Sequence, residues 1–236
     1  MRLLVSAVLS LTMLLMASPV LARKVTVEIT NLTNAIYYTP LLVVAHSRKH
    51  DLFEVGRPAS AALQKMAEGG DIADLAGEAR AAGAVVVEDP AGGILAPGKR
   101  TRVELEVERG QKRLSIVAML LPTNDGFVGL DSVVLPTGKG SQTVYLLGYD
   151  AGTEANDEII NGGGAPGTPG IPADPGGRGG TGGSGVSKAD VNTRVHVHRN
   201  NIGDSDPSGG SSDLDSTAHR WLNPVARVVI RARSSE

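Results

Sequence analysis

Eight almost wholly apolar residues in a row, 114–121 (LSIVAMLL), constrain the fold of this chain more than any other feature. A strand with one solvated face alternates between apolar and polar residues, and this segment does not. We therefore predict a central strand that is covered on both sides. Residues 24–30 (KVTVEIT), in contrast, alternate strictly and place Val25, Val27 and Ile29 on one face, which is typical of a half-buried strand.

Several further short segments have strand-like patterns and are separated by turn residues, which predicts an all-β fold, an antiparallel β-sandwich. Arginine- and glutamate-rich strands are expected at its edges. Alanine, leucine and charged residues at helical spacing predict a short helical insertion near residues 58–82, divided at Gly69–Gly70 and ended near Gly83. The strands are predicted at 84–88, 101–109, 114–121, 132–135, 142–150, 193–200 and 224–233, with an extended segment up to about His46.

The first 22 residues have the pattern of a secretory signal peptide. Arg2 precedes an apolar stretch, residues 3–16, and small or modest residues lead to a cleavage site after Ala22. The alternative is a membrane anchor, but the apolar stretch is shorter than the roughly 20 residues that a spanning helix needs. We expect a secreted or periplasmic protein with no transmembrane segment in the mature chain.

The composition limits how the chain can be stabilised and which partners it can bind. The chain has no cysteine, so it forms no disulfide, and its core or a bound metal must stabilise it. A formal net charge of −2 and the lack of a basic stripe argue against a nucleic-acid partner. Residues 161–190 are rich in glycine and proline, and we expect them to form a flexible insertion in one domain that spans residues 23–234.

The segment 122–135 (PTNDGFVGLDSVVL) is longer than a plain turn and carries Asp125 and Asp131. Asp125 and Asp150 each follow an apolar strand and precede small residues. If these strands end at the same rim of the sheet, the two carboxylates converge and repel each other unless a cation such as calcium lies between them. Asp131 is interpreted as a turn residue or one that bonds local backbone.

Six blocks that follow one another along the chain resemble the spondin N-terminal domain family, known from F-spondin, mindin and exported bacterial proteins. These blocks are DLFEVGRPAS, LQKMAEGGD, VELEVERG, LLPTNDGFVGLDSVVL, YDAGT and NPVARVVI. The resemblance implies a β-sandwich similar to C2 domains, one bound divalent cation, calcium, and recognition or adhesion outside the cell. The implied partner is an unknown extracellular or cell-surface ligand, a protein or a glycan, and the implied role is not enzymatic.

The motif match assigns the metal to Glu106, Asp125 and Asp150. Glu106 rests on the match alone, because it lies on the polar face of its predicted strand. The chain departs from the family at Gly126, where an aromatic residue is usual, and it lacks the family's cysteines.

Two histidines offer an alternative function. His196 and His198 lie two residues apart and therefore face the same side of a predicted strand, where they could hold a metal such as zinc in a cupin-like enzyme. No third ligand has a recognisable spacing, and no nucleophile motif or phosphate-binding loop is present. A purely structural role in the cell envelope is a further possibility.

Overall fold

The computed structural model describes residues 22–177, 179–189 and 191–233. The predicted signal peptide, apart from Ala22, lies outside the described residues. No helix in the described part of the chain is long and apolar enough to cross a membrane.

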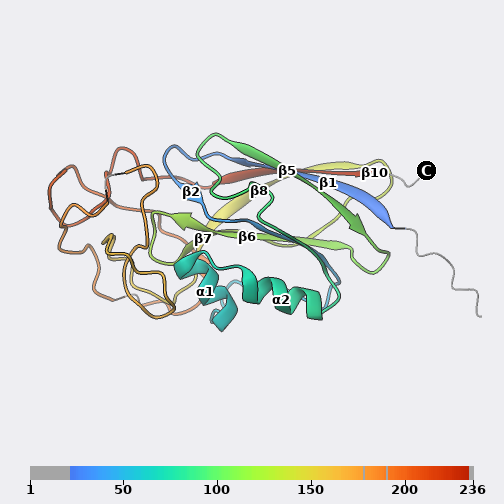
Figure 1. The fold of residues 1–236 in the computed structure, drawn as a ribbon, viewed down its shortest axis with the longest axis horizontal. Coiled ribbons are helices and arrows are strands. Elements are labelled where there is room, and N and C mark those ends of the chain that lie inside the picture. Colours follow the sequence, from blue (N-terminus) through green and yellow to red (C-terminus); the bar gives the residue numbers. More distant parts are fainter. Residues whose placement is uncertain (1–21, 178, 190, 234–236) are drawn as a thin grey trace, which may run out of the picture.

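The fold is mostly antiparallel β-sheet, as the sequence predicted, with two short helices (Figure 1). The elements are β1 (Arg23–Asn31), β2 (Tyr37–Tyr38), β3 (Leu42–His46), α1 (Ala61–Gly69), α2 (Ala73–Ala81), β4 (Val85–Glu88), β5 (Arg100–Val107), β6 (Arg113–Leu121), β7 (Gly126–Val134), β8 (Ser141–Asp150), β9 (His196–Val197) and β10 (Ala226–Arg233).

The strands follow one another in the order β4-β3-β6-β7-β8-β10-β1-β5, while β2 pairs with β6 and β9 pairs with β8. The sheet folds over on itself, so that β10, β1 and β5 form one layer and β6 and β7 lie below them (Figure 1). The two helices cover the outer side of this lower layer. The result is a β-sandwich with one layer of helices.

Strand β6 confirms the prediction from its apolar run. Leu114, Ile116 and Ala118 face the core between the two sheet layers, and Val117 and Met119 face the core beneath the helices. All five side chains are fully buried. Because successive strand residues point to opposite faces, a strand between two apolar cores needs apolar residues at every position.

The helical insertion also forms as predicted. The side chain of Ser60 accepts a hydrogen bond from the backbone N–H of Leu63 at the start of α1. Gly70 ends that helix in the left-handed conformation, with φ of 73°, and donates a hydrogen bond to the carbonyl of Met66. Glycine adopts this conformation without the steric cost of a Cβ atom, so the Gly69–Gly70 pair separates the helices.

Strand β7 corrects one boundary, because it begins at Gly126 and not near residue 132. Residues 126–131, which were not predicted as strand, contain a glycine that packing within the strand requires. A Cβ atom at Gly129 would lie 2.7 Å from the Phe53 ring and 2.8 Å from the Tyr149 ring. Asp131 is likewise not in a turn: with Ser132 it forms a β-bulge, two residues opposite the single residue Ser115 of β6.

The predicted strand 193–200 is shorter than expected, since only His196–Val197 form β9. The other described residues between 151 and 225 form loops at one end of the sandwich (Figure 1). The glycine- and proline-rich segment makes specific contacts there: Ile171 donates to the carbonyl of Ile159, and Gly167 donates to the carboxylate of Glu68. Its flexibility stays a prediction.

Candidate functional site

Asp125 and Asp150 lie side by side at the loop end of the sandwich. Asp125 closes the short β6–β7 connection and immediately precedes Gly126, which is in register with Asp150 at the end of β8. Both aspartates are fully buried. The convergence that the sequence made conditional on a shared rim is therefore confirmed, since the connection delivers Asp125 to the rim where β8 ends.

The two oxygens of the Asp125 carboxylate have different surroundings. Oδ2 accepts hydrogen bonds from the backbone N–H groups of Thr153, at 2.8 Å, and Glu154, at 3.1 Å, and from the Thr153 hydroxyl at 3.2 Å. Oδ1 is equally buried and has no hydrogen-bond partner. A buried carboxylate oxygen without a partner is costly, which makes Oδ1 the most informative atom of the site.

The Asp150 carboxylate is held by the chain that follows it. Oδ1 accepts a hydrogen bond from the Gly152 N–H at 2.8 Å, and Oδ2 accepts one from the Asn156 side chain at 2.7 Å. Burial, and then the neighbouring Asp150, raises the pKa of Asp125 to about 8. Two buried carboxylates this close favour protonation of one of them, or a cation, over two negative charges.

Both histidines of the alternative hypothesis lie at the same carboxylate. His196 Nδ1 is 3.8 Å from Asp150 Oδ1, and His198 Nε2 is 3.9 Å from Asp150 Oδ2. The two rings thus share a face, as the spacing predicted. His198 is buried against Trp221, with ring centroids 5.1 Å apart, and burial lowers its pKa to about 3.

The tautomer of His198 follows from its partners. Its Nδ1 accepts a hydrogen bond from the Asn200 N–H at 2.9 Å, so in the neutral ring the proton resides on Nε2. Nε2 has no hydrogen-bond partner and faces Asp150. Gly126 makes room for this ring, because a Cβ there would lie 3.1 Å from His198 Cδ2. The space next to Gly126 is therefore occupied by the side chains of Thr123 and His198.

Glu106 does not join this site. It lies in β5, exposed, with its carboxylate 3.8 Å from Lys24 Nζ. Glu106 is in register with Lys24, which lies seven positions before Asn31 on β1. Asn31 is level, through Ala226 of β10, with Leu146 of β8, and Asp150 lies four positions after Leu146. Because β1 and β8 run in the same direction, the two separations add up. Eleven positions correspond to about 36 Å along the strands, so Glu106 cannot share an ion with the aspartates. The motif match had no information on strand order, and that order places β5 at the far edge.

A segment that sequence reasoning underused, 153–158 (TEANDE), folds around the Asp125 turn. Asn124 donates hydrogen bonds to Asp157, at 2.8 Å, and Glu154, at 3.2 Å, and accepts one from the Glu158 N–H. Burial raises the pKa of Glu154 to about 7, and its Oε2 has no hydrogen-bond partner. The high density of polar residues just after Asp150 was the signal that could have identified this segment.

A cavity of about 370 Å³ opens beside the site and is lined by Thr153, Glu154, Asp157 and parts of the glycine-rich segment. Neither aspartate lines this cavity, although Thr153 and Glu154, which donate hydrogen bonds to Asp125, do. Within the described residues, no set of three or more histidine or acidic side chains is arranged to hold a metal ion. Protein side chains alone therefore leave part of any coordination shell to backbone oxygens and water.

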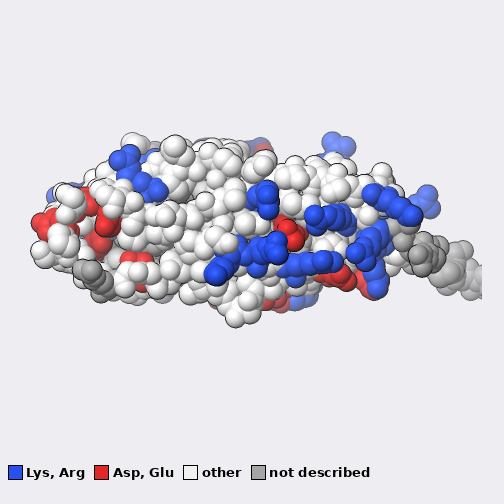
Figure 2. Space-filling view, turned by 90° about the horizontal axis from the view of Figure 1, so that it is seen from above, with Lys and Arg blue, Asp and Glu red and all other residues white. Residues whose placement is uncertain are grey.

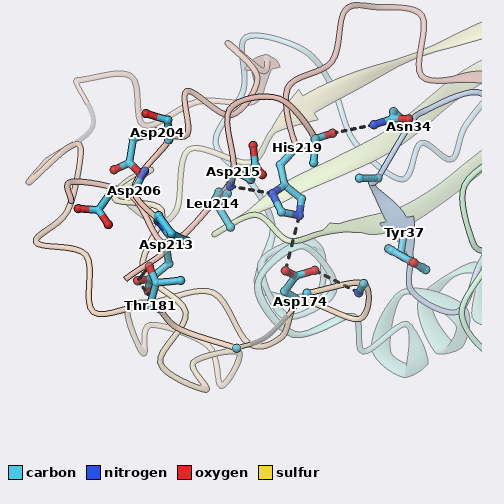
Figure 3. Close-up of a pocket in the computed structure, with 17 residues that line it drawn as sticks. Asn34, Tyr37, Asp174, Thr181, Asp204, Asp206, Asp213, Leu214, Asp215 and His219 are labelled. Atoms are coloured by element: carbon cyan, nitrogen blue, oxygen red, sulfur yellow. Dashed lines mark hydrogen bonds and ion pairs between the residues drawn. The ribbon is translucent and has the colours of Figure 1, made fainter. Parts of the chain in front are cut away.

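A second cavity of about 410 Å³ lies among the loops (Figure 3). Its carboxylates already have partners: Asp174 faces His219 Nε2 at 3.5 Å, and Asp213 accepts hydrogen bonds from the Thr181 and Gly183 N–H groups. Aspartates that bind nearby backbone amides stabilise loop conformations. We assign these residues to loop structure.

Comparison with known proteins agrees with the resemblance. The Spondin_N family model matches residues 30–159, more than half of the chain. The chain belongs to the spondin N-terminal domain family. Human Spondin-2 is 32% identical over 127 residues, which cover 50% of this chain and 38% of Spondin-2, and rat Spondin-2 matches with the same identity and coverage. The chain thus covers well under two thirds of these relatives.

The matched range bears on the site. It contains Asp125 and Asp150 together with the segment that surrounds them. It does not contain β9, with His196 and His198, or β10. The aspartate pair therefore lies within the part that this chain shares with the family, and the histidines lie in the part beyond it.

Proposed function

We propose that this protein is an exported recognition module, not an enzyme, in which Asp125 and Asp150 bind one calcium ion. The observation that carries the proposal is the buried, unpartnered Oδ1 of Asp125 beside the buried Asp150 carboxylate. A cation compensates this arrangement, and carboxylate oxygens are the ligands that calcium prefers. Family membership supports recognition outside the cell, and the signal-peptide pattern supports export.

The residues present fit a calcium ion in part. Asp125 and Asp150 would supply carboxylate oxygens, and the remaining positions of a shell of about six to eight oxygens would come from backbone carbonyls and water. Glu106 is not a member of this set. When bound, the ion would neutralise the pair and hold the β6–β7 turn to the segment after β8, in a protein without disulfides.

A second candidate is a transition-metal site on His196 and His198, which the unpartnered Nε2 of His198 favours. The Asn200 N–H occupies Nδ1 and leaves the proton on Nε2, so a metal could bind there only after this proton is lost. That N–H instead faces Asp150 and favours its charged form. We therefore assign His198 to orienting and stabilising the Asp150 carboxylate.

The test is metal analysis of residues 23–236 together with thermal melting in excess calcium and in chelator. We expect about one calcium per chain and a melting temperature that falls in chelator. Asp125→Asn with Asp150→Asn should abolish both effects, while Asp131→Asn, at an exposed carboxylate on β7, the strand that follows Asp125, should preserve them.

Three other results would contradict the proposal. Absence of bound calcium and of any chelator effect would leave the aspartates with a purely structural role. Firmly bound zinc, iron or nickel would support the histidine site and an enzyme. A calcium effect that persists in the Asp125/Asp150 double variant would place the ion elsewhere.

A further inference from the structure

We propose that the outer face of the β8–β10–β1–β5 layer binds an acidic polysaccharide. This basic face consists of outward-pointing cationic side chains from three neighbouring strands, and Figure 2 shows Lys and Arg gathered over this layer. Its members are Lys24, Arg100, Arg102, Arg227, Arg231 and Arg233.

Strand alternation and register bring these residues together. In β10, Ala226, Val228 and Ile230 are buried in the core, so Arg227 and Arg231 point outward. In β5, Arg100 and Arg102 alternate in the same way with buried residues. Arg227 and Arg100 flank the same residue of β1, Thr30, from its two sides. The cations therefore form one surface, although they come from three separate parts of the sequence.

Much of this positive charge has no ion-pair partner among the described residues. On the same face, Arg102 is 3.2 Å from Glu104 and Lys24 is 3.8 Å from Glu106. Arg100, Arg227, Arg231 and Arg233, in contrast, form no ion pair with any described residue. The same face also carries Glu28, Glu104 and Glu106, so its six cations outnumber its acidic side chains by three. Further acidic side chains gather at the loop end (Figure 2). The net charge of −2 thus conceals an excess of positive charge on this face.

The shape of the face favours a long anionic ligand. Arg227 and Arg233 are six positions apart on one strand, about 20 Å along its axis. Arginine presents a planar fork of donors that matches carboxylate and sulfate groups. A chain molecule with repeated anionic groups can contact several of these arginines at once, whereas a small anion contacts one.

Tyr145 favours a polysaccharide over other long anionic ligands. It lies directly opposite Arg227 on β8, on the same face, and is 59% exposed. An exposed aromatic ring next to an arginine can pack against the apolar face of a sugar while the guanidinium binds its acidic group. Tyr145 is also the one large apolar side chain exposed on these four strands in the described part, so the face lacks the apolar anchors that insertion into a lipid surface requires.

The inference rests on the proposed export for its setting, because acidic polysaccharides occur at cell surfaces. It does not depend on the calcium site. Asp150 lies beyond the part of β8 that pairs with β10, four residues past Leu146, and its side chain is buried. Polysaccharide binding measured in calcium and again in chelator separates the failure of one proposal from the failure of the other.

The experiment measures affinity of the mature protein for heparin and for polygalacturonate at near-physiological salt. We expect binding that weakens as salt increases. Arg100→Glu with Arg231→Glu, two exposed residues without ion pairs, should reduce affinity by about tenfold or more. The matched control is Arg48→Glu with Lys49→Glu, an equal charge change in the exposed turn after β3, and it should change affinity by less than about twofold.

Tyr145→Ala separates sugar recognition from simple ion exchange. It should weaken binding several-fold and leave the salt dependence unchanged, because it removes a ring and no charge. The proposal is overturned if neither polysaccharide binds, if the control double variant loses as much affinity as the test variant, or if Tyr145→Ala has no effect. Tighter binding to a single-stranded oligonucleotide or to phosphatidylglycerol vesicles would also overturn it.

Discussion

The strand body and the loop end of this molecule are stabilised by different interactions. In the body, β6 lies between two apolar cores, and side chains such as Ile116 and Met119 are fully buried among hydrocarbon. In the described loops between residues 151 and 225, buried polar side chains lie alongside buried apolar ones such as Ile171 and Leu214. Glu158, for example, is buried and accepts hydrogen bonds from the Ile202 and Gly203 N–H groups and from the Ser212 hydroxyl.

This difference explains where a cation site can arise. An apolar core tolerates no unpaired charge, whereas a region built from carboxylates and backbone donors can hold an acidic group that lacks one partner. The aspartate pair lies at the boundary, with Asp125 and Asp150 at strand ends and their donors in the loop. We therefore expect core substitutions to act on the whole fold and carboxylate substitutions to act on the loop end.

The largest expected effect is in the body. Ile116→Ala removes a fully buried side chain from β6 and should lower the free energy of unfolding by about 2–5 kcal/mol. The loss should be equal in calcium and in chelator, because the residue contacts only the apolar core. Urea unfolding measures it, with Val134→Ala, at a position 54% exposed, as the control that should change little. A loss confined to one condition would show that the body and the loop end are not independent.

The next effect is in the loops. Glu158→Gln preserves the shape of the side chain but replaces an accepting oxygen with a donor, against three donors that the carboxylate now satisfies. The cost should be about 1–3 kcal/mol, expressed as local opening of the loop end. Hydrogen exchange should accelerate at residues 200–214 and stay unchanged in β1 and β6, and Glu78→Gln on exposed α2 is the control. Acceleration in β1 or β6 would mean that the loops and the sheet unfold together.

These two regions also differ in how far the sequence predicts them. The body follows from hydrophobic periodicity, so β1, β5, β6 and β10 lie within a few residues of the predicted ranges. Residues 126–131 of β7 were not predicted as strand, and they include Gly126 and Gly129; glycines required by side-chain packing look the same in a sequence as glycines in a loop. Loop contacts such as that between Glu158 and Gly203 join distant residues with no periodic pattern, and sequence reasoning did not find them.

The candidate site was only partly predicted, because local patterns identify strands but not the order in which the strands pair. Asp125 and Asp150 each adjoin a predicted strand, so their convergence needed only a shared rim. Glu106 needed the strand order, which pairs β5 with β1 and which local patterns do not contain. The basic face was missed because β10 alternates its arginines with apolar residues, and Arg100 becomes their neighbour only through β1.

The third expected effect is that of Asp125→Asn, at the boundary between the strand body and the loop end. Its effect on stability changes sign when calcium is added. Asp125 has a folded-state pKa of about 8 against 3.8 for the ordinary group, so without calcium the folded state holds a proton that the unfolded state releases. Stability in chelator should therefore fall as pH rises from about 4 to about 8. Asp125→Asn removes this dependence and should stabilise the chelated protein at pH 8 by about 1–3 kcal/mol.

In excess calcium the same substitution should destabilise the protein relative to the parent, because the ion's contribution is lost. Chemical unfolding of parent and variant at pH 5 and pH 8, each with calcium and with chelator, tests both halves. Asp131→Asn is the control carboxylate. If Asp125→Asn destabilises the protein in chelator at pH 8, the buried Asp125 carboxylate does not cost the folded protein stability. The argument for a compensating cation would then be lost.

The smallest expected effect concerns Glu106, the carboxylate that the motif match assigned to the metal. Glu106 is exposed and pairs with Lys24 about 36 Å along the strands from Asp150. Exposed pairs of this kind contribute little, so Glu106→Gln should change stability by less than about 0.5 kcal/mol. It should leave calcium affinity unchanged, whereas Asp150→Asn should lower it strongly. Calcium titration of the two variants side by side measures both affinities. A weakened calcium affinity in Glu106→Gln would require β5 to approach the loop end, contrary to the strand order. It would also remove the distinction between a body that stabilises the fold and a loop end that holds the ion.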